Sequence, residues 1–371
     1  MKNAVNVLFI GPLPEPLTGH SLACQVFLDE LRKHHHVEVV NLSKSGFKNG
    51  VDSLGRIVQV LRILGAVWRR QATADVIYFT VSESFAGNLK DLVIYLLCFR
   101  RLGRMVIHLH GGAGLRGIML GNAGPQRWVN EFFVRRLNGA IVLGKRHADV
   151  FARALPATKI HIVPNFAEDY LFAPPEIIDR KFQCTNPLRI LYLSNLIPGK
   201  GYLELVDAFC GLDARAQASV TLDLAGGFAS ERDKRAFLDG IDGVAGIRYH
   251  GVVQGQSKRA LLHQAHLFCL PTYFPYEGQP ISLLEAYASG CAVLTTDHSG
   301  IRDVFEPETN GYEVAKGSVV SLRMALEKAL ANPERLRAMA ARNLQAAQRE
   351  YRESRFKTNV MRIVDGAIEH D

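Results

Sequence analysis

The chain has 371 residues, of which 48% are hydrophobic and 22% are charged. This length suits two domains of roughly 150 to 200 residues, and the composition excludes a disordered chain or a low-complexity repeat. The net charge of +8 arises in one half, because residues 1–185 hold 23 Lys and Arg against 14 Asp and Glu, whereas residues 186–371 hold 21 against 22.

The first residues, MKNAVNVLFIG, predict a strand and not a secretion signal, because their apolar stretch is short and interrupted by Asn6. The longest unbroken apolar run, residues 92–99, is far shorter than the roughly 20 residues that cross a bilayer. The six cysteines include no C-x-x-C pair, which indicates reduced thiols. We expect a cytoplasmic protein, with peripheral attachment to the inner face of the plasma membrane left open.

The first half alternates short β-branched runs with amphipathic helical patterns, of which the clearest cover residues 22–33 and 56–70. This β-α-β order predicts a parallel sheet between layers of helices. Periodicity stops at residues 166–187, where prolines favour a linker. The predicted strands are residues 4–11, 37–42, 74–80, 104–112, 139–144 and 160–164.

The second half repeats this order and then becomes helical from residue 319 onward. The predicted fold class is therefore α/β, with two doubly wound, Rossmann-like domains built on parallel sheets. The predicted strands of the second domain are residues 188–194, 219–227, 246–251, 266–272 and 291–297.

Ligands of doubly wound domains bind at the carboxyl ends of the strands, so the residues that follow strands are candidates. Gly11 and Gly19 bound a turn that is either a phosphate loop or a plain connection. The chain has neither G-x-G-x-x-G at this turn nor G-x-x-x-x-G-K-[ST], which argues against a dehydrogenase or a kinase. His110 ends a strand beside glycines that let a ligand approach, or it is simply buried.

Asn195 and Lys200 follow the first strand of the second domain, where an ammonium group can bind a phosphate, although loop lysines are usually solvated. Glu277 and Glu285 flank Pro280, which we place at the first position of a helix. Two carboxylates beside a helix N-terminus suit a polyhydroxylated anion such as a sugar nucleotide. The alternative is that Glu277 caps the helix and Glu285 pairs with a surface cation.

No D-x-D and no H-E-x-x-H occurs in the chain. Chemistry without a metal ion is therefore favoured, and no cofactor is expected.

Residues 275–314, PYEGQPISLLEAYASGCAVLTTDHSGIRDVFEPETNGYEV, resemble the signature block of the retaining GT-B glycosyltransferases of family four, the glycosyl transferases group 1. HLHGG at residues 108–112, VPN at residues 163–165 and the Lys200-Gly201 turn extend the resemblance over nearly the whole chain. It implies a GT-B fold, in which two Rossmann-like domains face a central cleft.

The resemblance assigns residues 1–170 to an acceptor-binding domain and residues 186–351 to a donor-binding domain. The last helix, within residues 352–371, would cross back onto the first domain.

The same resemblance implies that Glu277, His110 and Lys200 are the catalytic residues. Glu277 would lie by the donor sugar, His110 would touch the transferred sugar and Lys200 would neutralise the diphosphate. Glu285 would bind the ribose hydroxyls. The implied donor-binding residues are Gly19, Asn195, Lys200, Gly227, Val252, Gly278, Gln279, Ile281, Ser282 and Glu285.

Two positions depart from the family pattern. Asn195-Leu196 replaces Arg-Leu, which removes one cation from the diphosphate site. Gln279-Pro280 replaces the Phe-Gly of E-G-F-G, which removes one backbone donor and adds a side-chain amide. The second departure bears on the choice of sugar and leaves the reaction class unchanged.

We therefore expect transfer of a sugar from a UDP- or GDP-sugar to a glycan acceptor, with retention of configuration, in surface polysaccharide biosynthesis. The acceptor would be carried on a polyprenyl diphosphate. Residues 56–70, with four arginines and Trp68, form either a helix on an anionic membrane or a buried amphipathic helix. The alternative functions are a GT-B nucleotide-sugar epimerase and a nucleic-acid-binding protein, although no nucleic-acid motif is present.

Overall fold

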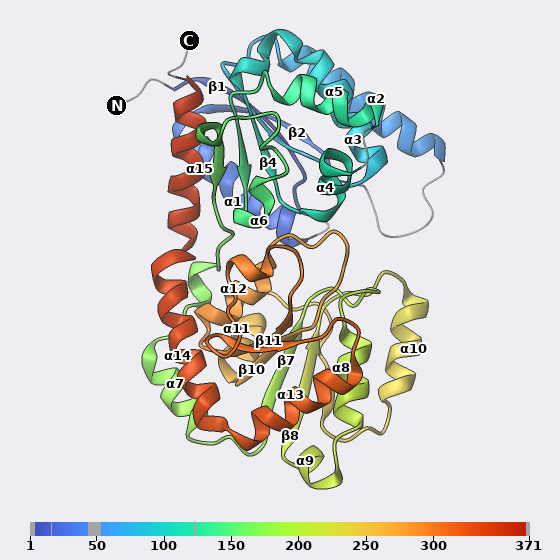
Figure 1. Ribbon diagram of the computed structural model, residues 1–371, viewed down its shortest axis with the longest axis vertical. Helices are drawn as coiled ribbons and strands as arrows, with labels where there is room; N and C mark the ends of the chain where they lie inside the picture. Colours follow the sequence, from blue (N-terminus) through green and yellow to red (C-terminus); the bar gives the residue numbers. More distant parts are fainter. Residues whose placement is uncertain (1–3, 16, 44–52, 122–123, 369–371) are drawn as a thin grey trace. The chain divides into compact units, whose positions relative to one another are not determined.

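The structure is a computed structural model that describes residues 4–15, 17–43, 53–121 and 124–368 (Figure 1). The chain divides into two compact units, which are described separately below. The first unit comprises Met1–Asn165 with Ser354–Asp371, and the second comprises Phe166–Glu353.

The first unit is built on a six-stranded parallel sheet with the order β2-β1-β3-β4-β5-β6. This order is doubly wound, because the chain runs outward from β1 to β2 and then returns past β1 to β3. Its strands are β1 (Asn6–Gly11), β2 (His36–Asn41), β3 (Val76–Thr80), β4 (Met105–Leu109), β5 (Gly139–Val142) and β6 (Ile160–Ile162).

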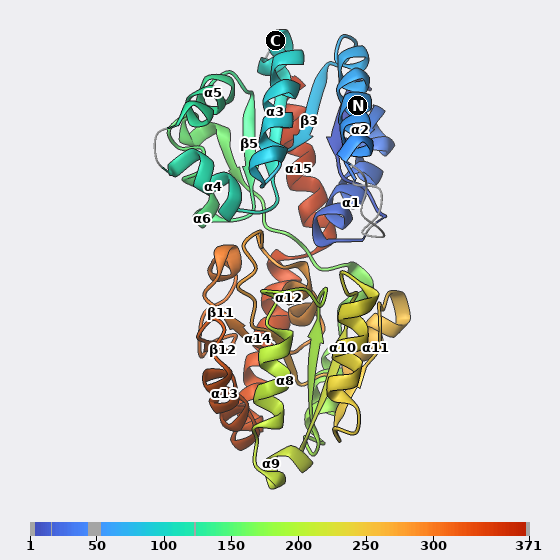
Figure 2. The same cartoon turned by 90° about the vertical axis from the view of Figure 1, so that its right-hand side faces the viewer.

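Right-handed crossovers place the helices of the first unit on both faces of this sheet. Figure 2 shows α2, α3 and α5 on the face toward the viewer, with α1 and α15 behind the sheet. The helices are α1 (Gly19–His34), α2 (Ser53–Arg70), α3 (Phe85–Leu97), η1 (Phe99–Arg104), α4 (Ala113–Leu120), α5 (Pro125–Val134), α6 (Lys145–Ala148), η2 (Ala157–Lys159) and α15 (Glu353–Ile368).

The second unit has a six-stranded parallel sheet with the order β12-β11-β10-β7-β8-β9. Its chain order along the sheet is that of the Rossmann fold. Its strands are β7 (Leu188–Leu193), β8 (Val220–Ala225), β9 (Ile247–Tyr249), β10 (Leu267–Leu270), β11 (Ala292–Thr296) and β12 (Gly311–Val314). Its helices are η3 (Asp169–Leu171), α7 (Pro175–Phe182), α8 (Tyr202–Cys210), α9 (Ala214–Ala218), α10 (Glu231–Ile241), α11 (Gly255–Gln264), α12 (Ile281–Ala288), η4 (Ser299–Asp303), α13 (Val319–Ala331) and α14 (Pro333–Glu350).

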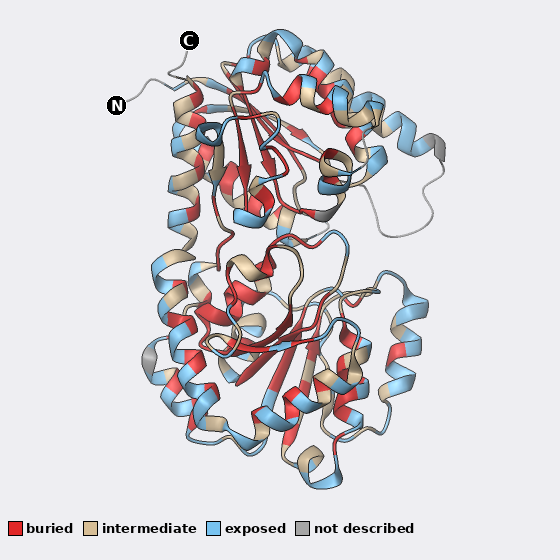
Figure 3. Ribbon diagram, in the orientation of Figure 1, coloured by how far each residue is buried: buried red, intermediate tan, exposed pale blue. Residues whose placement is uncertain are grey.

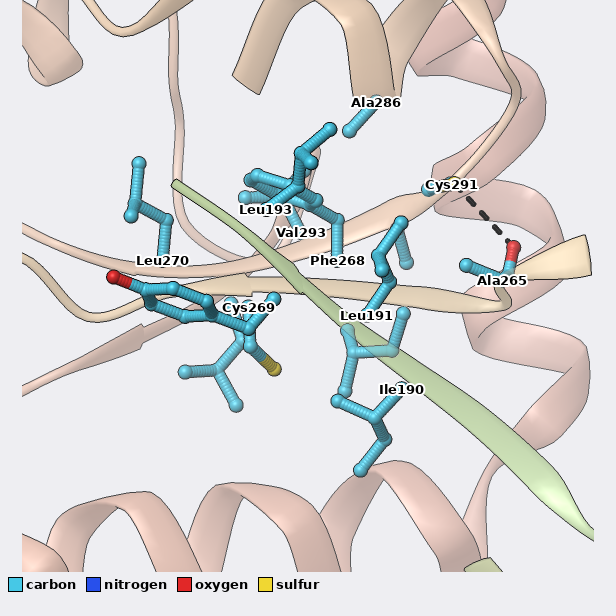
Figure 4. Close-up of a cluster of buried hydrophobic side chains, with 14 of the residues drawn as sticks. Ile190, Leu191, Leu193, Ala265, Phe268, Cys269, Leu270, Ala286, Cys291 and Val293 are labelled. Atoms are coloured by element: carbon cyan, nitrogen blue, oxygen red, sulfur yellow. Dashed lines mark hydrogen bonds between the residues drawn. The ribbon is translucent and has the colours of Figure 1, made fainter. Parts of the chain in front are cut away.

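Each unit has its own apolar core between sheet and helices. Figure 3 shows the central strands as the most buried segments of both units. In the second unit, Leu191 of β7, Phe268 of β10 and Val293 of β11 pack beside Ala286 of α12 (Figure 4). The long β-branched and leucine-rich runs seen in the sequence are therefore strands that are buried on both faces.

The eleven predicted strands correspond to β1 through β11, and the predicted α/β class with two Rossmann-like sheets is confirmed. Strand β12 was missed. It has only four residues, and it becomes a strand by pairing with β11 at the edge of the sheet.

The predicted linker at residues 166–187 is wrong, because η3 and α7 lie within it and belong to the second unit. Pro174 and Pro175 occupy the N-cap and the first turn of α7, where proline starts a helix instead of breaking one. Lys181 of α7 donates hydrogen bonds to the carbonyl oxygens of Ala265 and Ser289 at 2.8 and 3.0 Å. The predicted domain limits at residues 170 and 186 therefore move to residues 165 and 166.

Helix α15 packs within the first unit. Its Asp365 Oδ1 lies 3.1 Å from His35 Nε2 after α1, and its Phe356 ring centroid lies 6.4 Å from that of His108 on β4. The final helix of the chain therefore contributes to the core of a unit whose other elements end near residue 165.

All six cysteines are free thiols, and four of them are buried. Within the described ranges, no helix combines the length and apolar character needed to cross a membrane.

Candidate functional site

The second unit brings Lys200 and Glu277 together between β7 and β10, where the order of the strands in the sheet reverses. Strands β7 and β10 are neighbours, and the connections that leave them run to opposite halves of the sheet. Lys200 follows β7 and Glu277 follows β10, and the distance from Lys200 Nζ to Glu277 Oε2 is 2.6 Å. Such a switch point is where doubly wound sheets bind ligands.

Local contacts orient this ion pair. Thr272 Oγ1 donates to Glu277 Oε2 at 3.1 Å, and the Lys200 ammonium lies 5.1 Å from the centroid of the Phe274 ring. Gly201 adopts φ +79°, and a Cβ built there would lie 2.4 Å from the Pro271 carbonyl oxygen. Glycine is therefore required at residue 201 for the turn after β7 to approach the end of β10 closely enough for the pair to form.

Helix α12 begins directly after this pair, at Ile281. Pro280 is its N-cap and not its first helical residue as predicted, so the helix starts one residue later. Gly278 and Gln279 are buried in the loop before it, and Ser282 is half-buried in the first turn. The first N–H groups of an α-helix have no partner inside the helix, so these residues suit an anion.

Glu285 lies on α12 and is only 2% exposed. Its Oε1 lies 2.5 Å from Lys258 Nζ of α11, and the same ammonium lies 3.0 Å from Glu168 Oε2. Burial lowers the pKa of Lys258, but the two carboxylates outweigh burial and raise the pKa above its ordinary value. Glu285 is thus paired with a largely buried cation, whose side chain is 13% exposed, and not with the surface cation of the alternative interpretation.

Asn195, Gly227 and Val252 follow three adjacent strands, β7, β8 and β9, and they converge at one edge of the sheet. A Cβ built on Gly227 would lie 3.3 Å from Val252 Cγ2 and 3.8 Å from Asn195 Oδ1. Asn195 and Val252 are exposed. The predicted donor-binding residues of the second unit therefore cluster at the carboxyl ends of its strands.

His110 and Gly19 belong to the first unit. Gly19 is the first residue of α1, and the preceding Thr18 forms a capping box with Ser21. His110 is buried, and its ring stacks on His20 at 4.3 Å between centroids and lies 3.9 Å from His108. The Nε2 atoms of these three histidines are shielded from solvent and have no hydrogen-bond partner within the described part of the chain.

Burial keeps the histidines neutral near pH 7, since it lowers the pKa of His20 to about 4 and that of His108 to about 3. His20 and Cys24 lie one helical turn apart on α1, and their ligand atoms and that of His110 all lie within 4.8 Å of one another. Imidazole and thiolate suit a soft divalent cation, but burial raises the pKa of the Cys24 thiol, which would have to lose its proton first. The sequence did not reveal this group because its members come from separate elements. The prediction of metal-free chemistry stays a prediction.

Glu83 is a further residue that the sequence analysis missed. Its Oε2 accepts the Gly114 N–H at 3.0 Å at the start of α4, and its buried Oε1 has no hydrogen-bond partner among the residues that the structure describes. A Cβ on Gly111 would lie 2.5 Å from the Glu83 Cδ atom, and one on Gly114 would lie 2.0 Å from the Glu83 carbonyl oxygen. The glycines beside His110 therefore make room for the chain's own glutamate, which is a different use from the ligand approach that we predicted.

Residues 175–346 match the family model described as glycosyl transferases group 1. This segment covers most of the second unit and contains Lys200, Glu277 and Glu285.

Part of this chain also matches biosynthesis glycosyltransferases. The amylovoran biosynthesis glycosyltransferase AmsK of Erwinia amylovora is 27% identical over 183 residues, which are 48% of this chain and 43% of AmsK. The putative colanic acid biosynthesis glycosyltransferase WcaL of Escherichia coli K12 is 27% identical over 145 residues, which are 38% of this chain and 36% of WcaL. The matches thus span less than half the length of either relative.

Solved structures match over the whole chain. Anabaena Alr3699/HepE, in complex with UDP and glucose, has a TM-score of 0.71 at 16% identity and covers 98% of this chain and 100% of its own. WaaG, a glycosyltransferase involved in lipopolysaccharide biosynthesis, has a TM-score of 0.68 at 16% identity with the same coverage. At this identity the likeness shows the fold, which is that of the GT-B glycosyltransferases.

The environment of Glu83 leads to a prediction on pH and stability. Burial raises the pKa of Glu83 to about 7, although the backbone N–H groups of Gly114 and Leu115 act against the shift. Because the folded pKa is raised, the stabilising contribution of the protonated carboxyl is lost as the pH rises from about 4.5 to 7. The unfolding free energy of Glu83→Gln minus that of the parent should therefore increase by about 2 kcal/mol between pH 5 and pH 8, because only the parent is destabilised as its carboxyl ionises.

Denaturant unfolding at the two pH values measures this difference. Glu334→Gln, at an exposed position on α14, is the matched control and should show no such trend. An equal effect of Glu83→Gln at both pH values would show that the Glu83 carboxyl is not protonated in the folded chain at pH 5.

Proposed function

We propose that this chain is a glycosyltransferase of surface polysaccharide biosynthesis that transfers a sugar from a UDP- or GDP-sugar to a glycan acceptor. The observation that carries the proposal is the Lys200–Glu277 pair at the switch point of the second sheet. The family model over that unit, and the biosynthetic glycosyltransferases among the relatives, support it. The UDP bound in the HepE structure favours a UDP-sugar over a GDP-sugar as the donor.

The pair suits the charge changes of the reaction. Breaking a glycosyl–phosphate bond leaves negative charge on the diphosphate and positive charge on the sugar ring. The Lys200 ammonium and the N-terminus of α12 would stabilise the first charge, and the Glu277 carboxylate would stabilise the second. Both side chains are shielded from solvent, which strengthens these interactions.

Retention of configuration is part of the proposal. The acceptor hydroxyl would attack from the face that the diphosphate leaves, and its proton would pass to the departing phosphate oxygen. The acceptor would be a glycan on a polyprenyl diphosphate. The enzyme would be cytoplasmic and would act at the inner face of the plasma membrane. The anomer formed from a labelled donor, determined by NMR, tests the stereochemistry.

Incubation with a panel of UDP- and GDP-sugars, with and without membrane lipid extract, tests the reaction class. Transfer should need an acceptor from the extract. Conversion of the donor into another nucleotide sugar without acceptor would instead identify an epimerase. Salt-sensitive binding of nucleic acid without any donor turnover would contradict both enzyme assignments.

Glu277→Gln should lower turnover by at least about a hundredfold, because a positioned charge that stabilises the transition state is lost. Steady-state kinetics measure the change, and thermal unfolding checks the fold. Asp207→Asn on α8 is a control at a carboxylate outside the proposed site. Near-normal turnover in a folded Glu277→Gln variant would remove Glu277 from the mechanism.

Glu285→Ala should chiefly weaken donor binding, because contacts with the ribose hydroxyls are made equally in the ground and transition states. Glu168→Ala is the matched control, since it removes the other carboxylate of the same lysine and leaves Glu285 in place. Calorimetric titration with UDP measures both variants. If both variants lose the same affinity for UDP, Glu285 acts by orienting Lys258 and does not contact the ribose.

Activity should survive EDTA, because the proposed diphosphate site relies on Lys200 and backbone N–H groups and the chain has no D-x-D. Turnover before and after chelation measures this. Loss of activity that manganese or magnesium restores would contradict the proposal of metal-free transfer.

A further inference from the structure

Both tryptophans of the chain lie on the surface of the first unit. Trp68 of α2 is 60% exposed and Trp128 of α5 is 65% exposed. Tryptophan buries more apolar area than any other side chain, and in water-soluble proteins it is highly buried on average. The exposure of both tryptophans therefore indicates that this surface contacts an apolar partner.

The tryptophans belong to apolar stripes on α2, α3 and α5. Ile57, Leu61 and Trp68 recur at intervals of four and seven residues on α2, and each is exposed. The exposed residues Phe85, Leu89 and Leu96 recur at the same intervals on α3, and Trp128 and Phe132 are four residues apart on α5. These intervals align the side chains along one line of each helix, on the side away from the core.

The three stripes form one surface, which we call the aromatic face: the exposed apolar residues of α2, α3, η1 and α5. Helices α2, α3 and α5 lie side by side on the same side of the first sheet (Figure 2). Phe99 of η1 stacks on Phe132 of α5 at 6.2 Å between ring centroids, and the Arg136 guanidinium lies 3.8 Å from the Phe132 centroid. Exposed aromatic residues of η1 and α5 are thus in contact, and an arginine packs on them.

The elements that form the aromatic face also hold a surplus of basic residues. Helices α2 and α3, η1 and residues 125–136 contain eleven Lys and Arg and only two acids, Asp91 and Glu131. Asp91 is buried and bonded to Lys90, and Glu131 is paired with Arg127 and Arg135. The surplus of nine equals the entire excess of the first half of the sequence. Arg62, Arg100 and Arg136 are among its exposed cations.

We propose that the aromatic face is a membrane-docking surface that binds an anionic lipid bilayer. Exposed tryptophan and phenylalanine suit the boundary between headgroups and acyl chains, and the surrounding arginines are complementary to acidic headgroups. The face extends the α2 helix of the sequence prediction to three helices and η1. It lies within the first unit, and the proposal does not rest on the transfer reaction.

The charge distinguishes a bilayer from a second copy of this chain. In a two-fold dimer the same patch meets itself, so the exposed arginines of two copies, Arg62, Arg100 and Arg136 among them, would come together. Like charges in contact oppose such an interface, whereas an acidic bilayer attracts each of them.

Tryptophan fluorescence tests the proposal on the intact chain, because its only two tryptophans both lie on the aromatic face. Vesicles of phosphatidylcholine with phosphatidylglycerol should shift the emission to the blue and carry the protein upward in flotation. Vesicles of phosphatidylcholine alone should bind much less. Salt at 1 M should weaken the binding, because it shortens electrostatic screening to about 3 Å.

Matched substitutions separate the face from the rest of the surface. Leu96→Gln on α3 should reduce flotation, whereas Met324→Gln on α13, which is equally exposed at 62%, should not. Arg62→Glu with Arg100→Glu should weaken vesicle binding by at least about tenfold, since each basic residue near an anionic surface strengthens binding about fivefold. Arg342→Glu, exposed on α14, is the control for charge.

The proposal is overturned if acidic vesicles neither bind the parent chain nor shift its emission, or if the variants bind as the parent does. It is also overturned if the chain is a dimer in sedimentation and Leu96→Gln makes it monomeric without changing flotation. Because vesicle binding is measured without donor or acceptor, a failure here leaves the transfer reaction to be judged separately.

Discussion

The close approach of the turn after β7 to the end of β10 is the constraint on which the site of the second unit depends. Gly201 meets the Pro271 carbonyl oxygen so closely that no side chain fits between them. A larger residue would push the turn away and separate Lys200 from Glu277, which lie 2.6 Å apart. A single glycine therefore connects the order of the sheet to the chemistry at its edge.

Buried charges in this unit are arranged around cations that lie between elements. Lys258 joins Glu285 of α12 to Glu168 ahead of η3, and Lys181 of α7 binds the carbonyl oxygens of the C-cap residues of α11 and α12. A buried ammonium without partners would be costly, so these contacts specify how α7, α11 and α12 pack. The segment at residues 166–187 is consequently a structural part of the unit, although its sequence has the prolines of a linker.

Two features of the first unit are unusual for a folded domain. At the carboxyl end of β4, the buried Nε2 atoms of His108 and His110 have no hydrogen-bond partner among the described residues, and the helices α2, α3 and α5 carry exposed aromatic residues and cations. Both features cost folding stability, since buried polar atoms lack hydrogen bonds and apolar surface remains in water. Such costs are typical of surfaces and pockets that bind something else.

The amino-acid sequence by itself determined the positions of eleven strands, the doubly wound class and the helix that carries Glu285, because these follow from local periodicity and from glycine and proline. It also indicated Glu277 and Lys200 through a family resemblance. Only the tertiary structure decided which distant groups meet. Lys200 meets Glu277 because β10 pairs with β7. Glu285 meets Lys258 across two helices, and Glu83 fills the space at Gly111. Strand order and helix packing determine these contacts. The partners are far apart in the sequence, so local sequence patterns do not predict them.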